Sequence, residues 1–457
     1  MEYYEGYEKA EVGDIRLGKR LARILEQLAG DPAASISAAS GDPYQAKAAY
    51  RFLSNDDVSV EAITEITRIV TLKNINETKP PVLLVLQDTT ELNFSSLKAT
   101  KGLGSISGRS TASGIEVHSS VAVGEAGEMF GLLAQKLWVR PPENFGQSTA
   151  MSKKLPIEEK ESYKWLESLE KVGTDFPEST NAVYVCDREA DIYEFFCKAE
   201  KEGVQFLCRR RSDRNIEGED GLHKLDEFIS AQPVAGTIIV RVPRDSHTNR
   251  IERDAEVAIK FGKCRISKPQ PIKGGGGLPK SIEVYVVSAT EADPPQGQER
   301  IFWQLITNVP TKDFYDALTR VQWYTQRWKI ETFHRTLKSG CKVEKLQSGT
   351  AEKLMKLVAI YSIIALQIMQ LCYIARTRPD ESCEICLTED EWKILHRAAN
   401  KTRSLPEKPP TIHEAVVMIA KLGGFLSRKS DGFPGVTVIW RGLTKYYTIL
   451  DVAPFIM

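Results

Sequence analysis

Hydrophobic and polar positions divide the chain into a helical beginning, a strand-rich middle and a helical end. In residues 13–32 apolar side chains recur at helical spacing with arginines and lysines between them, and further helices are predicted around 45–55 and after Ser59. The pattern predicts an N-terminal helical domain over residues 1–75. Its basic face fits either a solvated helix surface or a nucleic-acid contact.

The middle of the chain contains short apolar runs that are typical of strands covered on both faces. The first run, residues 82–86, ends just before Asp88, and the second, residues 183–186, is followed directly by Asp187. Further strands are predicted in 115–138, 204–208 and 302–307. The sequence therefore predicts an α/β core with an aspartate at the exit of each of two buried strands.

Three larger regions follow from the same pattern. Residues 76–375 are predicted to form the main α/β domain, and strand-like segments separated by polar and glycine-rich loops predict a β-rich insertion over 217–300. The tail, residues 376–457, has helical patterns with Gly/Pro breaks and is predicted to be a C-terminal helical domain.

The segment from Tyr324 to Gly340 is predicted to be a helix whose polar residues gather on one side. At about 100° per residue, a band roughly 80° wide carries a phenol, three cations and one carboxylate, from Tyr324, Arg327, Glu331, Arg335 and Lys338. The opposite side carries Ile330, Phe333 and Leu337, an ordinary buried stripe. Taken alone, Arg327 and Glu331 also fit a surface i,i+4 pair, which contributes only a few tenths of a kcal/mol.

Composition does not identify the function, but it bears on the partners and location to be expected. Lys and Arg together number 61, as do Asp and Glu, so net charge gives no sign of a nucleic-acid partner. The amino terminus lacks the apolar core of a signal peptide. The most apolar stretch, residues 354–375, contains Lys356 and two glutamines and is predicted to be a buried helix. Eight irregularly spaced cysteines fit a reducing cytoplasm, and Cys383 and Cys386 lack partners for a zinc site.

Aspartates at the exits of neighbouring strands predict a shared site, because active sites of α/β sheets gather at the carboxyl ends of strands. Asp88 and Asp187 would then face each other, and two close carboxylates need a cation to stay ionised. With Glu331 as a third ligand, the set suits Mg²⁺ or Mn²⁺ and two-metal phosphoryl transfer. Each aspartate considered alone also fits a helix cap.

A signature of fixed spacing points to a family. Tyr324, Arg327, Glu331 and Lys338 spell Y-x2-R-x3-E-x6-K, preceded by LQDTT around Asp88 and CDREADIY around Asp187. The chain thereby resembles the DDE transposases of bacterial insertion sequences, of the transposon-five type, which have a ribonuclease-H-like core. The resemblance runs from GD-x-R at Gly13 through AYRF at 49–52 to AKLGG at 420–424.

The resemblance implies a role for particular residues. Asp88, Asp187 and Glu331 would be catalytic and would bind two Mg²⁺ ions, for which Mn²⁺ can substitute. Residues expected to contact DNA are Tyr324, Arg327, Arg335, Lys338, Arg188, Arg209, Trp303, Arg16, Arg20 and Arg51. Trp303 would handle a flipped base at a hairpin step, although a plain core position in FWQLIT also explains it.

The resemblance also implies a reaction and partners. Nicking at the transposon end, hairpin formation, hairpin opening and strand transfer would follow one another in a synaptic homodimer, with dimer contacts from the C-terminal domain. The partners would be the end repeats and target DNA in the bacterial cytoplasm, at the nucleoid when active, with no membrane. Alternatives are a ribonuclease-H-like nuclease, a catalytically silent DNA-binding descendant, and a metal hydrolase of small molecules.

Overall fold

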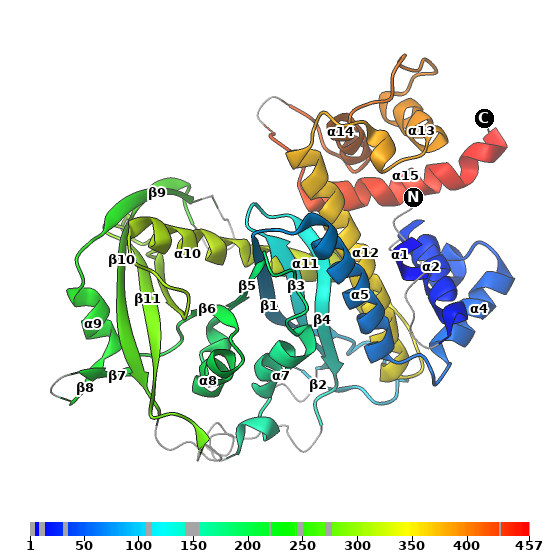
Figure 1. Ribbon diagram of the computed structural model, residues 1–457. Coiled ribbons are helices and arrows are strands. Elements are labelled where there is room, and N and C mark those ends of the chain that lie inside the picture. Colours follow the sequence, from blue (N-terminus) through cyan, green and yellow to red (C-terminus); the bar gives the residue numbers. More distant parts are fainter. Residues whose placement is uncertain are drawn as a thin grey trace. The chain divides into compact units, whose positions relative to one another are not determined.

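The computed structural model describes a mixed α/β protein (Figure 1). The residues described are 5–8, 14–30, 35–106, 112–141, 155–218, 221–242, 244, 250–269, 277–428 and 431–456. The chain forms two compact units, and strand β1 (Val82–Asn93) has its first half in one unit and its second half in the other. Gly13 of the predicted GD-x-R motif and part of the glycine-rich loop at 271–276 lie outside the described residues.

One unit consists of residues 80–88 and 147–328. Its core strands are the first half of β1, then β5 (Asn181–Cys186) and β6 (Gln205–Arg209), which run parallel to one another. The next strand, β12 (Phe302–Thr307), pairs antiparallel with β6. Leu83 to Leu86 have no exposed surface, so the apolar run at 82–86 is a buried strand, as predicted.

The sheet of this unit continues into the predicted β-rich insertion. Beyond β12 the order is β11, β10, β7 and β8, with β9 on β10. Their bounds are β7 Asn215–Gly218, β8 Gly221–Lys224, β9 Gly236–Val242, β10 Arg253–Ser267 and β11 Ser281–Glu291. Buried and exposed positions largely alternate along β10, which is the pattern of an antiparallel strand with one face in the core. Helices α9 (Leu225–Ala231) and α10 (Phe314–Gln326) pack on this part of the sheet.

Two helices of the same unit pack together near the parallel strands. They are α7 (Tyr163–Val172) and α8 (Tyr193–Lys201), and α8 also lies against β6 (Figure 1). Phe196 on α8 stacks on Phe206 of β6, with ring centroids 4.8 Å apart and planes 13° apart. The burial of these rings holds α8 against the sheet.

The other unit consists of residues 1–79, 89–146 and 329–457. It begins with helices α1 (Glu5–Glu8), α2 (Ile15–Gly30), α3 (Ile36–Ala39), α4 (Pro43–Leu53) and α5 (Val60–Thr78). Its strands are the second half of β1, β2 (Gly104–Ser105), β3 (Ser113–Gly124) and β4 (Met129–Trp138). Helices α5 and α12 (Ala351–Thr377) pack on β4 (Figure 1).

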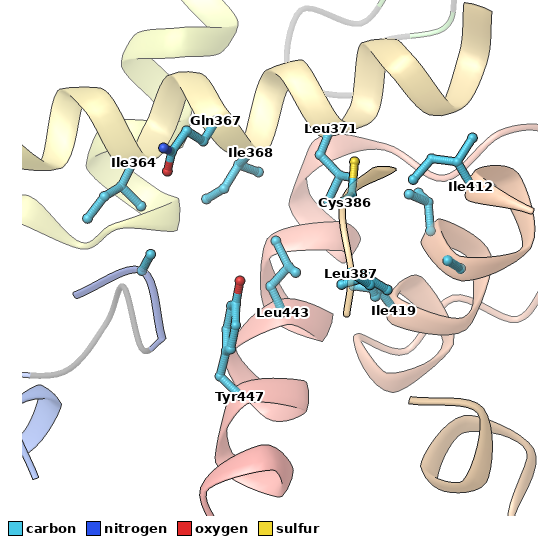
Figure 2. A pocket seen from close by; sticks show the side chains of 13 residues that line it. Ile364, Gln367, Ile368, Leu371, Cys386, Leu387, Ile412, Ile419, Leu443 and Tyr447 are labelled. Atoms are coloured by element: carbon cyan, nitrogen blue, oxygen red, sulfur yellow. The ribbon is translucent and has the colours of Figure 1, made fainter. Parts of the chain in front are cut away.

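The C-terminal helices of this unit surround an apolar cavity. Helices α13 (Glu389–Asn400) and α14 (Ile412–Leu422) each begin with a capping box, and α15 (Val436–Ile456) packs on α14. Figure 2 shows the cavity of about 50 Å³, lined by Ile364 and Ile368 of α12, Ile419 of α14, and Leu443 and Tyr447 of α15 among others. Together with the sheet core and the β-rich insertion, these terminal helices confirm the predicted fold class.

Helix α12 is the one helix in the described part of the chain that is long and apolar enough to cross a membrane. Of its most apolar 18-residue window, 72% is buried inside the protein. Tyr361, Ser362 and Ile360 are among its residues without exposed surface, on different sides of the helix. This burial is that of a core helix, as predicted for residues 354–375.

Candidate active site

The two predicted aspartates follow paired positions on adjacent parallel strands. Leu86 of β1 lies opposite Val185 of β5 in the strand register. Asp88 and Asp187 each come two residues after this last paired position, where neighbouring strands are about 4.8 Å apart. We expect both carboxylates on the same side of the sheet, because side chains two residues apart on a strand point to the same face.

Asp187 lies in a setting that disfavours its ionised form. Burial raises the pKa of its carboxyl, while a hydrogen bond from the backbone N–H of Glu189 and the charges of Arg327 and Lys164 oppose that rise. The N–H of Glu189 donates to Oδ1 of Asp187 at 2.8 Å, where Asp187 caps the 3₁₀ turn Arg188–Ala190. The aspartate is therefore both a helix cap and a half-buried carboxylate at a strand exit.

Asp88 is compensated by a cation from the signature segment. Nη1 of Arg327 lies 3.5 Å from Oδ2 of Asp88, and the two side chains are only 15% and 17% exposed. An ion pair this sheltered from water is screened less than a surface pair. The structure thus brings Arg327 to Asp88, while the predicted contact of Arg327 with DNA stays a prediction.

An aromatic and basic cluster surrounds Arg327. The ring of Tyr324 meets Trp303 edge-on, with centroids 5.4 Å apart and planes 67° apart, and the Arg327 guanidinium lies 5.8 Å from the Tyr324 ring. Nη2 of Arg209 donates to the carbonyl of Phe302 at 3.1 Å, and burial lowers the pKa of Arg209. Four of the predicted site residues, Tyr324, Arg327, Arg209 and Trp303, are thereby collected in one place.

Tyr324 and Trp303 are less exposed than a solvent-facing polar band would require. Tyr324 is only 4% exposed, although the sequence predicted it on a polar face, and burial raises the pKa of its hydroxyl. The Tyr324 hydroxyl lies close enough to the Arg209 guanidinium to oppose the lowering of its pKa. Trp303 is half-buried, which is compatible with both a core role and a stacking role.

The predicted single helix from Tyr324 to Gly340 is wrong in detail. Helix α10 ends at Gln326, because the N–H of Arg327 turns to the carbonyl of Tyr324, three residues back, at 3.1 Å. Helix α11 covers Trp328–Arg335, and a π-helical turn covers Thr336–Gly340, closed by the N–H of Cys341 on the carbonyl of Thr336. Hydrophobic periodicity shows the helical segment but not such local breaks.

Glu331, Arg335 and Lys338 belong to the other unit, which begins again at Lys329. The predicted apolar stripe below them is confirmed, since Ile330, Phe333 and Leu337 have no exposed surface. Glu331 and Lys338 are half-buried and Arg335 is exposed. The approach of Glu331 to the two aspartates stays a prediction.

Carboxylates are the ligands available for a metal at this site. Among the described residues, no group of three or more His, Cys, Asp or Glu side chains is arranged to hold a metal ion. The adjacent strand exits supply two carboxylates, and oxygen ligands without cysteine or histidine fit Mg²⁺ or Mn²⁺ rather than zinc. Burial that disfavours the ionised form of Asp187 is the situation that a divalent cation relieves.

The N-terminal arginines lie at the surface of their unit. The side chain of Arg16 is 86% exposed and pairs with Asp14 at 2.7 Å, and Nη1 of Arg20 donates to Gln45 at 3.1 Å. Arg51 is exposed in the last turn of α4, and Arg188 is exposed in the other unit, next to Asp187. These positions leave the guanidinium groups of Arg16, Arg51 and Arg188 accessible to a large partner.

Sequence reasoning missed the residues that lie beneath and beside the aspartates. Gln87, Ser168 and Lys164 make contacts at the strand exits, and all three are almost fully buried. One signal was present in the sequence, because Lys164 interrupts the apolar face of the segment that forms α7. Its meaning depends on which strands α7 covers, and that depends on the tertiary fold.

Comparison with protein families and solved structures gives matches along most of the chain. Residues 5–58 match "Transposase DNA-binding", residues 163–367 match "Transposase DDE domain", and residues 363–456 match "Transposase Tn5 dimerisation domain". A solved structure, described as a cryo-EM structure of the piggyBac transposase synaptic complex with hairpin DNA, has 12% sequence identity and a TM-score of 0.30. That similarity covers 83% of this chain and 69% of the other and is too low to support a further conclusion.

The match to a transposase DDE domain identifies the class of protein, an enzyme that acts on DNA. Within that class, the three matched families place the chain among the DDE transposases of the Tn5 type. The predicted family and the predicted enzyme class are both confirmed. DDE transposases generally use divalent metal ions, and the matched families also include a DNA-binding and a dimerisation domain.

Proposed function

We propose that this transposase works by a cut-and-paste route, with Asp88, Asp187 and Glu331 as the catalytic carboxylates. They would hold two Mg²⁺ ions, which Mn²⁺ can replace and which supply charge neutralisation at phosphorus and an activated attacking oxygen. Two observations support the proposal: Asp88 and Asp187 follow the last paired residues, Leu86 and Val185, of two adjacent parallel strands, and Arg327 forms an ion pair with Asp88.

The basic and aromatic residues would hold the DNA at the cleavage point. Arg327 and Arg209 lie within the cluster around Tyr324, where a phosphate would meet cations that are already partly stripped of water. Arg188, Arg335 and Lys338 would extend these phosphate contacts. Arg16, Arg20 and Arg51 lie within the region that matches the DNA-binding family and would bind the terminal repeat of the transposon.

Trp303 would serve the hairpin step. Its ring meets Tyr324 edge-on and is half-buried, so an aromatic side chain with some exposed surface lies next to Tyr324. Flipping a base out of the DNA stack costs a few kcal/mol of free energy, and stacking of that base on an aromatic ring offsets part of the cost. Nicking would free a 3′-hydroxyl, which attacks the opposite strand to form a hairpin, and hairpin opening would precede strand transfer.

The protein would act as a dimer on DNA in the cell. A homodimer would bring two transposon ends together, with contacts from the predicted domain at 376–457, most of which matches the dimerisation family. The protein would act on end repeats and target DNA in the bacterial cytoplasm, at the nucleoid. The domain boundaries near residues 75 and 375 stay predictions.

The test uses a labelled duplex that carries the element's own terminal repeat, read from the DNA that flanks the gene. Purified protein with Mg²⁺ is compared with Glu331→Ala and with Glu77→Ala, which changes an exposed glutamate of α5. We expect a nick at the repeat boundary, then a hairpin and a joined product, all lost in Glu331→Ala and kept in the control. Cleavage without hairpin or joining would support a nuclease instead, and binding unaffected by Glu331→Ala without cleavage would leave a DNA-binding protein.

A further inference from the structure

Helix α7 carries polar side chains on its buried face. Lys164 is 9% exposed and Ser168 is 4% exposed, and the two lie one helical turn apart between fully buried apolar neighbours such as Trp165. Lysine is seldom buried without a partner, because its charge loses hydration. Both side chains have partners, and each partner lies next to one of the two aspartates.

Ser168 reaches the strand pair through Gln87. Nε2 of Gln87 donates to Oγ of Ser168 at 3.1 Å, and Sγ of Cys186 donates to Oε1 of Gln87 at 3.7 Å. Gln87 directly precedes Asp88, and Cys186 directly precedes Asp187. One buried amide therefore connects both strand exits to α7, directly below the carboxylates.

Lys164, one helical turn before Ser168 on α7, contacts the turn that follows Asp187. Its Nζ lies 3.2 Å from Oε2 of Glu189, whose own backbone N–H donates to Oδ1 of Asp187 at 2.8 Å. The Lys164 side chain is 10% exposed and that of Glu189 is 57% exposed, so the lysine is the fixed member of the pair. The short turn that aims Asp187 is thus held by a cation on α7.

We propose that α7 is the element that positions the two catalytic aspartates, with Lys164 acting on Asp187 through Glu189 and Ser168 acting on Asp88 through Gln87. Lys164 is then a positioning residue that touches neither DNA nor metal. This inference rests on the proposed function of Asp88 and Asp187 and adds the residues that fix their relative placement. A displacement of about 1 Å in such a site can reduce a rate about a hundredfold.

The test compares Lys164→Met, Lys164→Arg and the matched control Lys171→Met. Lys171 lies on the same helix and pairs with Glu167 at 3.0 Å, but its side chain is 43% exposed. We expect Lys164→Met to slow nicking about 10- to 100-fold while the DNA concentration for half-maximal rate changes less than about twofold. Lys164→Arg restores the rate to within about fivefold, and Lys171→Met equals the wild type.

A second readout does not depend on DNA cleavage. Binding of Mn²⁺ is measured from the loss of the EPR signal of the free ion. The affinity for Mn²⁺ should fall about fivefold or more in Lys164→Met and recover in Lys164→Arg, because changes to residues that hold metal ligands in place typically cost 10- to 100-fold in metal affinity. Ser168→Ala removes the hydroxyl that accepts the hydrogen bond from Gln87, with little change in volume, and should also weaken Mn²⁺ binding. This variant tests the inference independently of whether Lys164→Met folds. Equal rates and equal Mn²⁺ affinities for Lys164→Met, Ser168→Ala and Lys171→Met would overturn the inference.

Failure of the proposed function would look different. In that case wild-type protein leaves the terminal-repeat duplex intact, or Asp88→Asn and Asp187→Asn cut it at the wild-type rate. The Mn²⁺ titration of the α7 variants still reports on positioning, because it needs no DNA.

Discussion

The ion pair between Arg327 and Asp88 should contribute measurably to the stability of metal-free protein. At the observed 3.5 Å, and with an effective dielectric constant of about 20, the Coulomb attraction is about 5 kcal/mol. Desolvation of the two groups and their residual exposure offset more than half of this, which leaves about 2 kcal/mol. Arg327→Met should therefore lower Tm by about 4–8 °C for a cooperative unit of this size.

The assay is thermal unfolding in EDTA, with Arg327→Lys and Arg188→Met measured beside Arg327→Met. Lysine keeps the charge and should recover part of the loss, while Arg188 is exposed in the same unit and its removal should leave Tm unchanged within about 1 °C. Addition of Mg²⁺ should raise the Tm of Arg327→Met more than that of wild type, because a divalent cation then replaces the lost positive charge. An Arg327→Met protein that melts with wild type in EDTA would refute this reasoning.

A double-mutant cycle separates the pair from other effects of the substitution. Asp88→Asn combined with Arg327→Met should lose less stability than the sum of the two single changes, with a coupling of about 1–2 kcal/mol. Strictly additive losses would mean that Arg327 stabilises the unit through other contacts, such as its approach to the ring of Tyr324.

Three other predictions follow from the same structure. Burial raises the pKa of Asp187 in the folded protein, so its ionisation costs stability once the pH exceeds the pKa of the unfolded chain. Asp187→Asn should therefore have a higher Tm than wild type at pH 7 in EDTA. Unfolding curves measured across pH should show that this difference disappears well below pH 4. Trp303→Ala should nick the terminal repeat at close to the wild-type rate but form hairpin at least about tenfold more slowly, with Trp303→Phe intermediate; equal losses at both steps in single-turnover gels would assign Trp303 to the core instead. Ile419→Ala, which enlarges the apolar cavity in Figure 2, should cost about 2–5 kcal/mol in denaturant unfolding, and a smaller loss than that of the exposed control Leu426→Ala would contradict the packing described for α14.

Much of the fold and part of the site could be predicted from the sequence. The apolar run at 82–86 and the one at 183–186 predicted buried strands, and these strands pair in parallel up to Leu86 and Val185, two residues before the aspartates. The stripe of Ile330, Phe333 and Leu337 predicted the buried side of the signature helix. Patterns of this kind are readable because strand and helix periods reflect burial along one element.

The remainder depends on contacts between elements that are distant in the sequence. Gln87 and Ser168 are 81 residues apart, and no period in either segment predicts their hydrogen bond. Tyr324 belongs to a polar band by its angle on the helix but is buried because Trp303 of β12 covers it. The break at Arg327 is a local choice of hydrogen-bond partner, and hydrophobic periodicity is insensitive to it.

The central claim is that Asp88, Asp187 and Glu331 form one metal site, and anomalous diffraction from a DNA-bound crystal soaked in Mn²⁺ would test it most directly. We predict anomalous peaks within about 2.5 Å of oxygens from all three carboxylates, and loss of those peaks in Asp187→Asn. Peaks held by the aspartates with Glu331 turned away, or peaks elsewhere in the protein, would contradict the assignment of Glu331 as the third catalytic carboxylate.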